Sequence, residues 1–149
     1  MLDRHSRHHR NAHPLGNVSL FAACSREDLA AIVAVTTLID PPAGRVLCTQ
    51  GAPGDEFFVI VDGAATVTID GDDVASLGPG DFFGEMALLD GGPRIATVTT
   101  TSPARLLVLT RPEFNALLER VPAVCHRILI GVGHRVRQAE HLTLAPVGA

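Results

Sequence analysis

Residues 83–98 read FGEMALLDGGPRIATV, which holds more polar chemistry than a segment that only fills a core needs. Gly84 lets the backbone turn or approach a ligand closely, and the EMALL that follows favours a short helix. Arg94 stands between a Gly-Gly-Pro turn and a β-branched run, so it can project back over the start of that helix. The N–H groups at a helix start suit a phosphate. The segment therefore predicts an anion pocket.

Glu85 and Arg94 are the two charged residues on which this pocket depends. A guanidinium can donate to two phosphate oxygens at once. Glu85 would repel a phosphate if it pointed the same way, and a ribose 2′-hydroxyl beside the phosphate would give it a donor instead. The alternative is that Glu85 and Arg94 pair with each other at the rim of a barrel. The flanking glycines and the turn favour the pocket.

This segment resembles the phosphate-binding cassette of cyclic nucleotide-binding domains, whose pattern is roughly F-G-E-L/I-A-L-L, a short spacer and P-R-A/S-A-T-V. The resemblance implies that Arg94 holds the cyclic phosphate and Glu85 the ribose 2′-hydroxyl, with backbone N–H groups of Gly84, Ala87 and Ile95 completing the cradle. By family position, apolar side chains of residues 74–77 line the base pocket. The expected ligand-binding residues are Val74, Ala75, Leu77, Phe83, Gly84, Glu85, Met86, Ala87, Arg94, Ile95 and Ala96.

Ile95 departs from the family pattern, which usually has Ala, Ser or Thr at this position. Family members that favour cyclic GMP (cGMP) often place a Thr there, and its hydroxyl meets the guanine amino group. Ile95 can neither donate nor accept a hydrogen bond, so the resemblance implies that cyclic AMP (cAMP) binds more tightly than cGMP.

Turn residues recur about every ten residues before the cassette and separate short apolar runs, which is typical of an antiparallel barrel or jelly roll. Turns are predicted at 41–44, 51–55, 62–63 (a hairpin), 70–73 and 78–81. Strands are predicted at 36–40, 46–48, 57–61, 64–69, 95–101 and 105–110. The expected fold is mainly β with flanking helices: an antiparallel β-roll, or jelly-roll-like barrel, with an N-terminal helix, an inserted phosphate-binding helical turn and C-terminal helices. The resemblance extends over about residues 20–137 and includes the order of the barrel glycines.

Three helices outside the barrel are predicted. Ser25 is a helix N-cap with an acidic first turn, and that helix runs to about Val35. A second helix begins near Pro112, and a third runs from Pro122 to about Glu140 with an apolar stripe. That stripe packs over the barrel mouth or against a second copy of the chain. Two glycines inside the third helix, Gly131 and Gly133, each cost about 1 kcal/mol relative to Ala. The resemblance implies that this helix swings over the ligand as a lid or shifts its packing, and the alternative is a helix that stays packed.

Length and composition favour one domain of 149 residues, with a core at 17–140 between a disordered tail at 1–16 and a flexible tail at 141–149. His5, His8, His9 and His13 in the first tail fit no metal site by spacing. The net charge of −4 gives no general attraction to nucleic acid. Cys24, Cys48 and Cys125 form no Cys-x-x-Cys motif and indicate core residues in a reducing compartment. With no signal or membrane-spanning segment in the sequence, we expect a cytoplasmic protein.

Two other functions share this kind of barrel. A metal-dependent cupin enzyme needs several histidines inside the barrel, and the sequence has none between His13 and His126. A transcription regulator of the catabolite-activator type has a helix-turn-helix after the long helix, and the chain stops too soon for one. We therefore expect a sensor of cyclic AMP that is not an enzyme, holds no metal, and neither binds DNA directly nor inserts in a membrane. It would signal to an unidentified protein effector, with a homodimer through the last helix left open. The alternative is a domain that has lost the ligand and serves as an interaction module.

Overall fold

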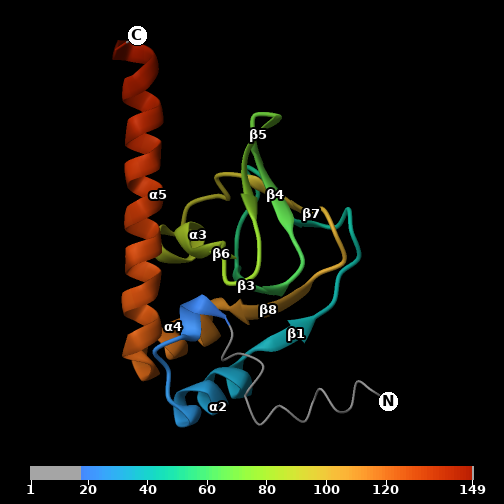
Figure 1. The fold of residues 1–149 in the computed structure, drawn as a ribbon, viewed down its shortest axis with the longest axis vertical. Coiled ribbons are helices and arrows are strands. Elements are labelled where there is room, and N and C mark those ends of the chain that lie inside the picture. Colours follow the sequence, from blue (N-terminus) through green and yellow to red (C-terminus); the bar gives the residue numbers. More distant parts are fainter. Residues whose placement is uncertain (1–17, 149) are drawn as a thin grey trace.

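The chain folds as two four-stranded antiparallel sheets with helices around them (Figure 1). The computed structural model describes residues 18–148, apart from the side chains of Ser19, Val136 and residues 138–148. The first sheet has the order β1 (Thr37–Ile39), β8 (Arg105–Thr110), β3 (Glu56–Asp62), β6 (Phe82–Phe83). The second has the order β2 (Val46–Cys48), β7 (Thr97–Thr100), β4 (Ala65–Ile69), β5 (Asp72–Leu77). The predicted β-roll with flanking helices is confirmed.

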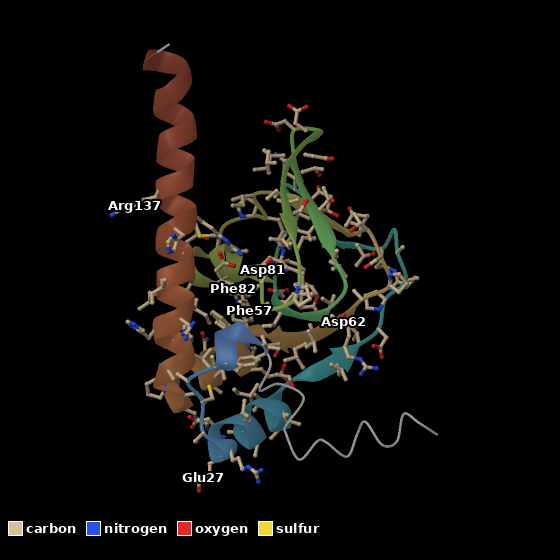
Figure 2. All side chains as sticks on the ribbon, in the orientation of Figure 1. Glu27, Phe57, Asp62, Asp81, Phe82 and Arg137 are labelled. Carbon is tan, nitrogen blue, oxygen red and sulfur yellow. The ribbon has the colours of Figure 1, made fainter. Side chains whose placement is uncertain are left out.

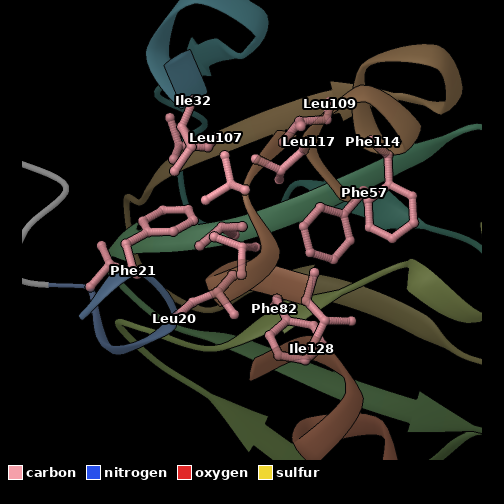
Figure 3. Packing of buried hydrophobic residues seen from close by; sticks show 14 of the residues in the cluster. Leu20, Phe21, Ile32, Phe57, Phe82, Leu107, Leu109, Phe114, Leu117 and Ile128 are labelled. Carbon is pink, nitrogen blue, oxygen red and sulfur yellow. The ribbon is translucent and has the colours of Figure 1, made fainter. Parts of the chain in front are cut away.

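Strands β3 and β8 have near-continuous apolar runs, and both faces of these strands are buried. Successive side chains of a strand point to opposite faces. Phe58 and Ile60 therefore lie in the core between the sheets, whereas Phe57 and Val59 lie in a larger core against the helices. In that larger core Phe57 contacts both Phe114 and Phe82, with ring centroids 4.7 and 5.7 Å away (Figure 3).

Helices cover the outer face of the first sheet. They are the 3₁₀ turn η3 (Ser19–Phe21) and the helices α2 (Arg26–Val35), α4 (Arg111–Arg120) and α5 (Pro122–Gly148). The predicted start of α2 is confirmed, because the Ser25 hydroxyl accepts from the Asp28 N–H at 3.0 Å while the Asp28 carboxylate accepts from the Ser25 N–H at 3.1 Å. The inserted helix α3 (Glu85–Asp90) lies between β6 and β7 in the chain and beside α5 in space (Figure 1).

The turn at Asp62-Gly63 is not a hairpin, so that prediction was wrong. It joins β3 to β4, which belong to different sheets. Gly63 has φ +92°, and a Cβ there would lie 2.6 Å from the Pro103 carbonyl oxygen, so the glycine serves a sharp turn packed against another loop. The hairpin connects β4 to β5 through Asp70 and Gly71, whose φ values of 54° and 84° suit a tight two-residue turn.

Helix α5 continues to Gly148, beyond the end expected near Glu140. The sequence from 141 to 145 contains no glycine or proline that would end a helix. Strand β7 is shorter than predicted, since Ile95 and Ala96 precede it without joining the ladder. The expected disordered tail at 1–16, with its four histidines, lies outside the described residues. Within residues 18–148, no helix has the length and apolarity that crossing a lipid bilayer requires.

Candidate functional site

A cavity of about 780 Å³ opens between the second sheet, α3 and α5. All of the residues expected to bind a ligand line it, so the fold brings residues 74–77 of β5 together with the cassette. Their contact with a ligand stays a prediction. Helix α5 supplies a further wall that the sequence did not assign to the site: Arg127, Ile130, Gly131, His134 and Arg135.

Arg94 is held in place by backbone carbonyls. The residue is only 8% exposed, and its Nη1 and Nη2 donate to the carbonyl oxygens of Gly84 and Glu56 at 3.1 and 2.8 Å. A guanidinium has five N–H donors, so several remain for an anion. Among the described side chains, no carboxylate lies within ion-pair distance of Arg94. The arginine is therefore a fixed cation at the cavity with donors to spare.

Two glycines make room for this guanidinium. Gly84, with φ +95°, begins α3, and a Cβ there would lie 2.7 Å from the Glu56 carbonyl oxygen and 2.8 Å from Nη1 of Arg94. A Cβ on Gly54 would lie 2.5 Å from Nε of Arg94. Real side chains do not approach this closely, so both positions need glycine for Arg94 to keep its place.

Glu85 is the most unusual residue of the site, because it is a carboxylate with 1% exposure. Its Oε2 accepts from Nη1 of Arg135 at 2.5 Å, and its Oε1 is buried without a hydrogen-bond partner among the described groups. The proposed rim pair between Glu85 and Arg94 is therefore wrong, since the partner comes from α5. A buried polar atom without a partner costs free energy and indicates a donor that arrives from elsewhere.

Arg135 also joins α5 to the first sheet. Its Nη2 donates to the carbonyl oxygen of Phe82, and its guanidinium lies 4.7 Å from the centroid of the Phe82 ring. Gly131, one turn earlier, faces the same ring, and a Cβ there would lie 2.5 Å from Cζ of Phe82. A Cβ on Gly133 would meet nothing within 4 Å. The two glycines thus differ although helix propensity gives both the same cost, and of the two only Gly131 permits the close approach of α5.

The spacing along α5 could have placed Arg135 in the site. It follows Gly131 by four residues and Ile128, a buried member of the apolar stripe, by seven. Residues at these intervals share one face of a helix. Arg137 does not share that face, and Figure 2 shows it on the side of α5 away from the sheets.

A second cavity, of about 730 Å³, lies on another side of Arg94. Two acidic residues, Asp55 and Glu56, and two arginines, Arg94 and Arg111, line it. The first cavity has three arginines against two acidic residues, so it suits a phosphate better. Cys48 lines both cavities, and burial raises the pKa of its thiol to about 11. At neutral pH this thiol is therefore protonated and weakly nucleophilic. Among residues 18–148, no three His, Cys, Asp or Glu side chains gather closely enough to hold a metal ion.

Proteins similar in sequence to this chain include cyclic nucleotide-gated potassium channels. The chain is 38% identical over 115 residues to the cyclic nucleotide-gated potassium channel mll3241 of Mesorhizobium japonicum. This match covers 77% of this chain and 32% of the channel. The chain spans about a third of the length of the curated relatives it matches.

Solved structures show the same fold. The catabolite activator protein of Thermus thermophilus superposes with a TM-score of 0.75 at 30% identity, over 87% of this chain and 62% of that chain. The regulatory domain of Toxoplasma gondii PKA, co-crystallised with cAMP, superposes with a TM-score of 0.60 at 34% identity, over 70% of this chain and 41% of that chain. Residues 40–121, more than half of the chain, match the family model for the cyclic nucleotide-binding domain. The chain therefore belongs to the cyclic nucleotide-binding domain family.

Proposed function

We propose that the chain is a sensor that binds a cyclic nucleotide, cyclic AMP in preference to cyclic GMP, and signals to a partner protein through α5. The observation that carries this proposal is the unpartnered Oε1 of Glu85, a carboxylate 1% exposed beside a cavity that also holds Arg94. A ribose 2′-hydroxyl would donate to this oxygen, and the cyclic phosphate would accept from the remaining N–H groups of Arg94. One acceptor and one cation on one cavity suit a ribose whose hydroxyl neighbours a phosphate.

Two relatives support the choice of ligand. The Mesorhizobium channel is, by its name, gated by cyclic nucleotides, and the Toxoplasma domain was crystallised with cAMP. The partner protein, a cytoplasmic location, a lack of direct DNA contact and a homodimer through α5 stay predictions. Leu129, which is 61% exposed on α5 and does not line the cavity, is an apolar residue that a partner or a second copy would cover.

The base preference is the first prediction. Ile95 is 60% exposed at the cavity, so a guanine amino group beside it would find no acceptor. We expect cyclic AMP to bind more tightly than cyclic GMP in equilibrium competition. Ile95→Thr should then improve cyclic GMP binding by about 0.5–1.5 kcal/mol, the net worth of one hydrogen bond. Ile95→Val, which has the shape of Thr without the hydroxyl, is the control. Tighter binding of cyclic GMP by the wild type would reject the preference.

The second prediction concerns α5 as the output. A ligand shifts this helix only by binding its docked state better than its undocked state. We expect cyclic AMP to slow amide hydrogen exchange over residues 124–137. Gly133→Ala should stabilise the helix by about 1 kcal/mol without a clash and so reduce the ligand effect. Gly131→Ala should instead speed exchange in the free protein, because its Cβ would collide with Phe82.

These exchange rates also distinguish the alternative function. Protection that is already high and does not respond to saturating ligand would reject α5 as the route of the signal. In the alternative, an interaction module that has lost its ligand, the Arg135–Glu85 pair would serve only to tie α5 to α3. Such a module would show no saturable nucleotide binding at all, whereas a sensor with another output would still bind.

A further inference from the structure

We propose that Arg135 is a positioning residue for ribose recognition: it holds Glu85 so that the free carboxylate oxygen receives the ribose 2′-hydroxyl. This makes α5 part of the ribose site rather than only a cover over it. The inference rests on the proposed function, because it requires a cyclic nucleotide in the cavity. It assigns the discrimination between ribose and deoxyribose to a contact that joins α3 and α5.

The geometry of Arg135 fixes the direction of the Glu85 carboxylate. The arginine is held at three points: Nη1 at Oε2 of Glu85 (2.5 Å), Nη2 at the Phe82 carbonyl, and the guanidinium plane over the Phe82 ring. A planar guanidinium fixed in this way allows few orientations of the carboxylate that it binds. Glu85 itself begins α3, directly after the turn at Gly84. Both ends of the Glu85 side chain are therefore constrained.

The charge of Arg135 offsets part of the cost of burying the Glu85 carboxylate. The Glu85 side chain is 1% exposed, and a buried charge without a partner is strongly unfavourable. Arg135 satisfies one oxygen and leaves Oε1 without a partner. A hydroxyl that donates to the free oxygen of this carboxylate would make a charge-assisted hydrogen bond. The pair also lowers the repulsion between Glu85 and a phosphate in the same cavity.

Two other roles for Arg135 give different results. If Arg135 only tied α5 to the barrel, its loss would weaken the binding of every nucleotide by the same factor. If it competed with the ribose for Glu85, its loss would tighten cyclic AMP binding. If Arg135 positions Glu85, its loss gives a third result: the affinity falls for the nucleotide that has a 2′-hydroxyl and not for the one that lacks it.

The test compares dissociation constants for cyclic AMP and 2′-deoxy-cyclic AMP by calorimetry. We expect the wild type to prefer cyclic AMP by about 10- to 100-fold, the worth of a hydrogen bond to a charged group. Arg135→Gln should reduce this ratio to about threefold or less. Arg135→Met, which can still pack on Phe82, should do the same and serves if the first variant does not fold. Arg137→Gln, an exposed change two residues later, should leave both constants unchanged. Arg127→Gln removes a positive charge from the same cavity and should weaken both nucleotides alike.

An unchanged ratio in Arg135→Gln and Arg135→Met would overturn the inference while leaving the sensor intact. Tighter cyclic AMP binding by these variants would also overturn it, in favour of competition. A wild type that binds both nucleotides equally would refute the role of Glu85. A wild type that binds neither would refute the proposed function itself, and the inference with it.

Discussion

Replacing Arg94 with alanine is expected to weaken cyclic AMP binding by about 2–5 kcal/mol, or roughly 30- to 5,000-fold. The guanidinium is 8% exposed and anchored by two carbonyls, so the protein's own backbone holds it in place. Its loss removes this buried charge and its donors from the cavity, which Arg127 and Arg135 still line. Calorimetric titration measures the change.

Arg105→Ala is the matched control for this variant. Arg105 is a strand arginine whose side chain is 53% exposed and pairs with Asp40 at 2.8 Å, away from the cavity. It should leave the affinity unchanged. Arg94→Ala also leaves the carbonyls of Glu56 and Gly84 without these donors, so its folding must be checked by circular dichroism at the titration temperature. An affinity equal to that of the wild type in folded Arg94→Ala would refute the phosphate role.

Phe82→Ala is expected to lower the free energy of unfolding by about 3–5 kcal/mol. The ring is 7% exposed, packs against Phe57, and makes a cation–π contact with the guanidinium of Arg135. It also receives α5 at Gly131, so its removal takes away the surface on which the helix docks. We therefore expect a loss of stability together with faster amide exchange in α5.

Denaturant unfolding measures the first effect and hydrogen exchange the second. Leu89→Ala, at a position 52% exposed on α3, should change stability by less than about 0.5 kcal/mol. A cost in Phe82→Ala similar to that of Leu89→Ala would show that the ring is not part of the core. A large cost without faster exchange in α5 would show that the helix docks independently of Phe82.

Much of the barrel could be predicted from the sequence because its signals are local. The turns bounded the strands, and Ser25 as an N-cap with an acidic first turn placed the start of α2. The pairing of strands is not local. The sequence placed a hairpin at Asp62-Gly63, but β3 pairs with β8 and β6 instead. The choice depends on which sheet buries each face of the strand, and a turn signal carries no such information.

The site shows the same division. The cassette could be found because its glycines, carboxylate and arginine lie within a few residues of one another. The partner of Glu85 could not be found in this way. It is not Arg94, nine residues away in the sequence, but Arg135, which is 50 residues away. The structure selects Arg135 because α5 docks against Phe82, and that docking needs Gly131 to lack a side chain. Helix propensity alone predicts only that Gly131 destabilises the helix, whereas in the structure it allows the helix to dock.

The most direct test of the central claim is a calorimetric titration of the full chain with cyclic AMP. We expect saturable heat with one nucleotide bound per chain, and weaker binding of the ring-opened 5′-AMP, whose phosphate is no longer fixed beside the 2′-hydroxyl. The absence of saturable heat up to about 1 mM cyclic AMP, corresponding to less than about 4 kcal/mol of binding free energy, would contradict the assignment of this cavity to a cyclic nucleotide.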